Sequence, residues 1–194
     1  MDIILIIISA VFINNFVLVQ FLGICPFLGV SKKIESALGM GMGVILVMTV
    51  ASALTYAVNK WLLVPLEVEF LQTIAFIFII AGIVQMLEMA LKKLSPSLYS
   101  SLGVYLPLIT TNCAILGVAM LNLSHALVTS LFTAVLNGLF SGVGFTLAIF
   151  LLAGLREKLE LASIPKALKG FPITLITACF MAMAFSLFGM IQLG

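Results

Sequence analysis

The chain is organised around the stretch Gly23-Ile24-Cys25-Pro26-Phe27-Leu28-Gly29-Val30, which interrupts an apolar run with a cysteine, a proline and two glycines. A second copy, Asn112-Cys113-Ala114-Ile115-Leu116-Gly117-Val118, carries its cysteine 88 residues further on. The two copies share the pattern Cys-x-x-Leu-Gly-Val. Four identical positions can arise by chance in a chain this apolar, so a true repeat requires that the surrounding organisation also repeats.

The composition predicts a membrane protein. Of the 194 residues, 63% are hydrophobic and only 8% are charged, with a mean hydropathy of +1.35. Soluble domains carry about 25% charged residues. The sequence has no stripe of basic residues of the kind that binds nucleic acid. Its three cysteines do not fit the disulfide framework of a secreted protein. Because the start of the chain lacks the basic region and cleavage site of a signal peptide, we expect the first apolar stretch to remain as a membrane segment.

Six windows are long enough to cross a bilayer, which requires about 20 apolar residues. The fold class expected is therefore an all-α polytopic membrane protein with six transmembrane helices in a single membrane domain, residues 1–194. The windows are residues 3–27, 36–58, 70–91, 102–123, 126–153 and 172–192.

The basic residues predict the orientation of this bundle. Eight of the nine lie in the first, third and fifth loops between the windows. The positive-inside rule places those loops in the cytoplasm and both chain termini outside. The eight are Lys32, Lys33, Lys92, Lys93, Arg156, Lys158, Lys166 and Lys169.

This orientation predicts two inverted three-helix repeats, residues 1–93 and 94–194. Three spans in each half is an odd number, so the halves run in opposite directions and are related by a pseudo-two-fold axis in the membrane plane. Spans two and five each carry a pair of glycines four residues apart, Gly39/Gly43 and Gly138/Gly142, although these pairs are separated by 99 residues rather than 88. We interpret them as close-packing positions.

Both cysteine motifs are predicted to break their helices. Pro26 has no N–H to donate and disfavours helix at Cys25, so a short extended segment is expected around Cys25 in span one. In span four, Pro107 and the polar run 110–112 predict a break near the middle of the window. Discontinuous helices at equivalent places of two halves are the usual indication of a binding site at the bilayer midplane.

The pseudo-two-fold axis predicts that Cys25 and Cys113 face each other. They are either buried thiols that act as small hydrophobes or metal ligands, since a thiolate in hydrocarbon needs a compensating positive charge. A disulfide at that depth is disfavoured. Iron–sulfur clusters and structural zinc take four protein ligands, and neither His125, expected in an external loop, nor Cys179, which has no repeat mate, is suitably placed. A metal site would therefore need ligands from another chain.

Three asparagines interrupt the apolar spans. Asn14 and Asn15 lie in span one and Asn112 lies in span four. We expect them to bond backbone groups that the helix breaks leave unsatisfied. The alternative is that they support metal ligands or line an ion path.

Residues 14–18 (NNFVL), the Cys25 motif and residues 106–118 (LPLITTNCAILGV) together resemble the RnfA/NqrE family, and the resemblance covers the whole chain. It implies that the chain pairs with a homologous, oppositely oriented membrane subunit, RnfE or NqrD, and that each contributes two cysteines to one intramembrane [2Fe–2S] cluster. Carried over residue by residue, the ligands of this chain are Cys25 and Cys113. The candidates for residues that surround and position these ligands are their neighbours in the sequence, Gly23, Ile24, Pro26, Asn112 and Ala114.

The resemblance is closer to the Rnf branch of the family. It implies a subunit of an ion-translocating oxidoreductase in a bacterial or archaeal cell membrane, without a complete active site of its own. The subunit would relay electrons between flavin and iron–sulfur subunits, with ferredoxin and NAD as the terminal partners. The alternatives are an NqrE-like subunit of the Na⁺-translocating NADH:quinone reductase, a small inverted-repeat transporter, and a structural assembly subunit. A transporter should carry a charged or strongly polar residue at the midplane, and the spans show none there beyond asparagine, threonine and thiol.

Overall fold

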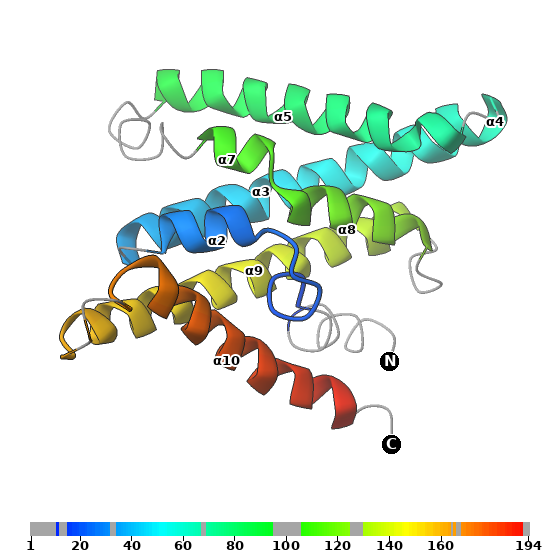
Figure 1. The fold of residues 1–194 in the computed structure, drawn as a ribbon. Helices are drawn as coiled ribbons and strands as arrows, with labels where there is room; N and C mark the ends of the chain where they lie inside the picture. Colours follow the sequence, from blue (N-terminus) through cyan, green and yellow to red (C-terminus); the bar gives the residue numbers. More distant parts are fainter. Residues whose placement is uncertain are drawn as a thin grey trace.

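The computed structural model describes residues 11, 15–31, 34–66, 69–94, 106–124, 130–163, 165 and 168–191, and within these the regular elements are helices (Figure 1). The first half contains α2 (Ile24–Val30), α3 (Ile34–Val58) and α5 (Gln72–Leu94). Between α3 and α5 lie a π-helical turn (Asn59–Leu63), the short α4 (Val64–Leu66) and a 3₁₀ turn (Glu69–Leu71). The second half contains α7 (Leu106–Thr110), α8 (Cys113–Ser124), α9 (Leu131–Glu160) and α10 (Phe171–Ile191).

The helices confirm the prediction of an all-α polytopic membrane protein. Three helical stretches are long and apolar enough to cross a bilayer: Ile34–Leu63, Gln72–Ala90 and Leu131–Glu160. Two shorter apolar stretches, Pro107–Leu123 and Phe171–Leu187, match the fourth and sixth windows. Most of the start of span one, including Asn14, lies outside the described residues, as do Lys32, Lys33, His125 and Lys166.

Helices α3 and α9 form the centre of the bundle and share its most extensive contact. Gly41 of α3 faces the side chain of Thr146, and Gly142 of α9 lies so close to α3 that an added Cβ would be 2.8 Å from the Cα of Ile45. Since the later position on one helix meets the earlier position on the other, α3 and α9 pack antiparallel. This agrees with the opposite orientations expected for spans two and five, while the repeat relationship of the two halves stays a prediction.

The predicted glycine pairs do not all serve the same contact. Gly138 faces Ser52 of α3, so Gly138 and Gly142 are both close-packing positions, as expected. On α3, an added Cβ at Gly43 would lie 3.3 Å from Ile109 of α7. The α3 glycine that faces α9 is Gly41, which the four-residue pattern did not single out.

The outer surface of the described helices is apolar. Large side chains that point outward include Phe78 (75% exposed) on α5 and Phe180 (67%) on α10. The core between α3 and α9 is apolar as well, with Met48, Phe145 and Ile149 almost fully buried. A protein that is apolar inside and outside is solvated by lipid or by partner chains, not by water.

Helix α9 extends seven residues beyond the end predicted for span five. Arg156 and Lys158 therefore lie on a helix, and their placement on the cytoplasmic side of span five stays a prediction. The segment 155–160 (LREKLE) consists of strong helix formers. These residues continue the helix after the apolar window ends.

Candidate functional site

The break in span one lies before Cys25. Residues 15–23 form irregular turns that end at Gly23, whose φ of 82° is in the left-handed region. The N–H of Phe27 then donates to the carbonyl of Gly23 (3.3 Å), and this bond starts α2. Cys25 and Pro26 thus lie in the first turn of a helix, and the extended segment expected around Cys25 was wrong. The missing N–H of Pro26 costs little there, because first-turn N–H groups have no partner within the helix.

Asn15 satisfies the backbone of this irregular segment. Its Oδ1 accepts the N–H groups of Val17 (3.1 Å) and Leu18 (3.4 Å), and its Nδ2 donates to the carbonyls of Val11 (3.2 Å) and Gly144 (3.0 Å). The side chain is fully buried. The expectation that Asn15 bonds backbone groups at the break is confirmed, and its bond to Gly144 fastens the segment to α9.

The break in span four lies where the sequence predicts it, at Thr111 and Asn112 between α7 and α8. The Oδ1 of Asn112 accepts the N–H of Ala114 (3.0 Å), and its carbonyl accepts the N–H of Ile115 (3.1 Å). Asn112 therefore caps the start of α8. Its buried Nδ2 has no partner within the part of the chain that the structure describes.

The two breaks meet at Gly23. A Cβ added there would lie 2.9 Å from Oδ1 of Asn112, 3.0 Å from Cβ of Ala114 and 3.1 Å from Phe145 of α9. From this junction α2 and α8 run in opposite directions (Figure 1). Cys25 is the second residue of α2 and Cys113 is the first residue of α8. The structure thus brings together the N-terminal ends of two half-helices, each with a cysteine in its first turn.

Both cysteines are exposed on this chain, so neither fills its core as a small hydrophobe. Cys25 lines a hollow of about 600 Å³ between α2 and the facing ends of α9 and α10, together with Arg156 and Phe171. Cys113 lines a separate hollow of about 290 Å³ formed by α5, α7 and α8. That the two thiols face each other stays a prediction.

The donor set at the junction fits half of an iron–sulfur site. Among the described residues, no three side chains of His, Cys, Asp or Glu are grouped closely enough to hold a metal ion. Two exposed thiols are half of the four cysteine ligands that a [2Fe–2S] cluster takes. Cys179 is also exposed, on α10, and lines a third, mostly apolar hollow with Phe21 and Ile24.

From the sequence, Arg156 is only one of the basic residues that predict the orientation of the bundle. In the structure, Arg156 lies at the end of α2. Its Nη1 donates to the carbonyl of Leu28 (3.0 Å) and to Oγ of the fully buried Ser31 (2.9 Å). A cation there satisfies last-turn carbonyls and complements the negative end of the helix dipole. The available signal was that Arg156 is the chain's single arginine among eight lysines, since only arginine offers several fixed N–H donors.

Comparison with known proteins gives one consistent family. The model of the Rnf-Nqr subunit family of membrane proteins matches residues 3–192. The A subunit of the Na⁺-translocating ferredoxin:NAD⁺ oxidoreductase complex of Acetobacterium woodii is 58% identical over the full length of both chains. The A subunit of the ion-translocating oxidoreductase complex of Syntrophotalea carbinolica is 56% identical over 95% of this chain and 94% of the relative. The corresponding subunit of Ectopseudomonas mendocina is 50% identical over 99% of both.

Proposed function

The chain belongs to the Rnf-Nqr family of membrane subunits, and on this basis we propose that it is the A subunit of an ion-translocating oxidoreductase complex and holds half of an intramembrane [2Fe–2S] cluster. The observation that carries the proposal is the junction at Gly23, where two half-helices start with exposed cysteines. A buried pair of thiols would be inert, whereas exposed thiols at converging helix ends are available to a second chain.

Cys25 and Cys113 are the two ligands from this chain. The other two come from a homologous membrane subunit of the RnfE type in the opposite orientation, which presents an equivalent pair. When bound, the cluster supplies one-electron transfer within the membrane. The pairing follows from ligand counting, because four thiolates are needed and this chain offers two at the junction.

Two local features set the positions of the helix starts that carry the cysteines. Asn112 fixes the start of α8 through its bond to Ala114. Gly23 lets the two starts approach to a distance that a side chain would prevent.

Helix α9 supports the Cys25 half of the site from both ends. Asn15 bonds to the Gly144 carbonyl ahead of α2, and Arg156 bonds to the Leu28 carbonyl at its far end. Gly144 and Arg156 both lie on α9, which packs along α3 through glycines. The ligand position therefore depends on the rigid centre of the bundle and not on a surface loop.

In the complex, this subunit passes electrons between flavin and iron–sulfur subunits, with ferredoxin and NAD as terminal partners and the movement of an ion as the coupled step. The basic loops face the cytoplasm and both termini lie outside, so the halves have opposite orientations in the membrane. The exposed apolar faces of α5 and α10 offer surface to lipid and to the partner subunits.

Serine variants test this proposal in the intact membrane complex. Cys25→Ser and Cys113→Ser should each abolish ferredoxin-dependent NAD⁺ reduction and remove about two irons per complex, while the complex still assembles. Cys179→Ser is the matched control, because this thiol is also exposed but lies outside both motifs, and it should retain activity and iron. Full iron content together with an unchanged [2Fe–2S] EPR signal in Cys25→Ser or Cys113→Ser would contradict the proposal.

A further inference from the structure

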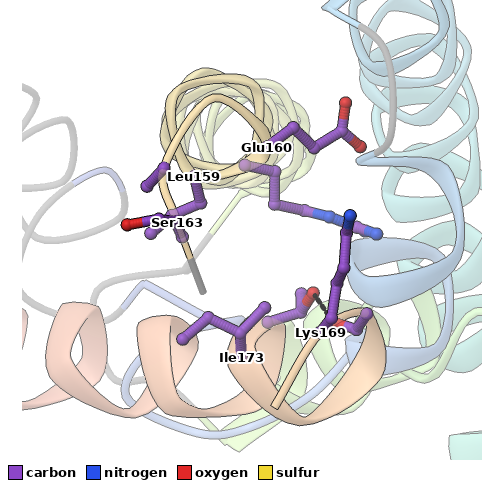
Figure 2. A pocket seen from close by; sticks show the side chains of 9 residues that line it. Leu159, Glu160, Ser163, Lys169 and Ile173 are labelled. Atoms are coloured by element: carbon purple, nitrogen blue, oxygen red, sulfur yellow. Dashed lines mark hydrogen bonds between the residues drawn. The ribbon is translucent and has the colours of Figure 1, made fainter. Parts of the chain in front are cut away.

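A pocket of about 280 Å³ lies between the C-terminal end of α9 and the N-terminal end of α10 (Figure 2). Figure 2 shows Leu159 and Glu160 at the end of α9 with Ser163 just beyond it, and Lys169 just before α10 with Ile173 in its first turn on the other side. Arg156 completes the polar part of the lining. The proposed cluster ligands do not line this pocket.

The charge of the pocket favours an anion. Arg156 and Lys169 face a single carboxylate, that of Glu160. The bonds from Arg156 to Leu28 and Ser31 use its Nη1. A guanidinium has five N–H donors distributed over three nitrogens, so it can bind a second group as well. Arginine and lysine together form the usual recognition pair for phosphate oxygens.

The backbone at the start of α10 adds to this preference. Gly170 has a φ of 101°, which turns the chain into the helix, and an added Cβ there would meet nothing within 4 Å. The hydroxyl of Thr174 donates to the Gly170 carbonyl (3.0 Å), so this polar group has a partner within the helix start. The N-terminal end of the 21-residue α10 adds a partial positive charge. Its N–H groups contribute little directly, because Pro172 has none and the N–H of Ile173 donates to the carbonyl of Leu168 (3.2 Å).

The surroundings of the pocket distinguish a lipid from a soluble anion. Leu161, which follows α9, is 88% exposed, and Phe171, the first residue of α10, is 62% exposed. Leu159 and Ile173 make part of the lining apolar. Helix α9 is long and apolar enough to cross a bilayer and α10 is a shorter apolar helix, so we infer that the pocket between their ends lies at the level where headgroup phosphates meet the acyl region. Basic pockets between helix ends at this level bind anionic headgroups.

We propose that this pocket binds the phosphate of an anionic membrane phospholipid. Arg156 and Lys169 bind the phosphate oxygens, and the exposed Leu161 and Phe171 lie against the glycerol and the first acyl carbons. The lipid then occupies the seam between α9 and α10. This site does not depend on the cluster and would exist in a complex without iron.

Native mass spectrometry of the delipidated complex, titrated with phosphatidylglycerol, tests the site. Lys169→Ala should weaken phosphatidylglycerol binding about five-fold, the effect of one juxtamembrane cation. Lys169→Glu should weaken it further. Lys158→Ala and Lys158→Glu are the matched controls, because Lys158 is exposed near the same end of α9 but does not line the pocket. Both control variants should bind as the unmodified complex does.

Two further titrations identify the source of the phosphate. Phosphatidylcholine with the same acyl chains should bind more weakly than phosphatidylglycerol, and inorganic phosphate at millimolar concentration should not displace the lipid. Equal effects of the Lys169 and Lys158 variants, or equal binding of the two lipids, would overturn the proposal. Displacement by inorganic phosphate would assign the pocket to a soluble anion and would overturn it too.

Discussion

Gly23 and Ala114 belong to the two cysteine motifs, and the chain brings them together so closely that a Cβ on Gly23 would lie 3.0 Å from that of Ala114. This contact joins the starts of α2 and α8. It explains why a residue without a side chain precedes α2, because the same position also has a φ of 82°. The groups that hold this junction and the surrounding helices in place can each be tested by substitution.

Replacing Gly23 with alanine should destabilise the junction. The left-handed backbone costs about 1–2 kcal/mol for a residue with a Cβ. The added methyl group would also crowd Asn112 and Ala114, and such overpacking typically costs about 1–3 kcal/mol more. The thermal midpoint of the complex should fall. Gly29→Ala is the control, since its nearest contact would be 3.9 Å away, and it should leave the midpoint unchanged or raise it. Equal midpoints for the two variants would argue against a tight junction.

Arg156→Met should loosen α2. The variant removes charge-assisted bonds to Leu28 and Ser31, each worth about 1.5–3 kcal/mol. Hydrogen exchange of the amides in residues 27–31 should become faster, and Arg156→Lys should recover part of the protection. Lys158→Met, on the same helix but exposed, should leave exchange in α2 unaltered. Unchanged exchange in Arg156→Met would show that α2 does not depend on Arg156.

Gly142→Ala should destabilise the contact between α3 and α9. The added Cβ would lie 2.8 Å from the Cα of Ile45, which is backbone and cannot move aside cheaply. Overpacking of this kind costs about 1–3 kcal/mol. Gly154→Ala, on the same helix and facing open space, should stabilise by about 0.5–1 kcal/mol. Thermal unfolding of the two variants should therefore shift in opposite directions, and a shift in the same direction would contradict the packing.

Two substitutions of Asn112 should distinguish the effect of its oxygen, which caps α8, from the effect of its buried amide nitrogen. Asn112→Ala removes the bond to the Ala114 N–H, which costs about 1 kcal/mol. Asn112→Ser keeps an oxygen cap and removes the buried Nδ2 that has no partner among the described residues. Hydrogen exchange at residues 114–116 should be fastest in Asn112→Ala and no faster in Asn112→Ser than in the original chain. Faster exchange in the serine variant would mean that the amide has a partner in the complex.

The sequence predicts the elements better than it predicts their local starts. The position of the break in span four was predicted correctly, because Pro107, two threonines and Asn112 all favour a turn at one place. In span one, the rule that proline disfavours helix in the residue before it placed the break at Cys25. In the structure, Gly23 has already ended the irregular segment, and Pro26 lies in the first turn of α2, where a missing N–H has little cost.

The contacts between distant segments could not be predicted from local patterns. The bond from Arg156 to Leu28 joins residues that are 128 positions apart. Likewise, a pair of glycines spaced by four residues indicates close packing but not the partner helix, so Gly43 meets α7 while Gly41 meets α9. The repeated motif singles out Cys25 and Cys113 in the sequence, and their role as ligands stays a prediction.

The central claim is that Cys25 and Cys113 bind one [2Fe–2S] cluster together with a partner subunit. Low-temperature EPR of the reduced, purified complex tests it most directly, with Cys25→Ser, Cys113→Ser and Cys179→Ser compared at equal assembly. We expect a [2Fe–2S] signal in the original complex and in Cys179→Ser, and its loss or a clear change of g-values in each of the other two variants. An identical signal in all four complexes would contradict the claim.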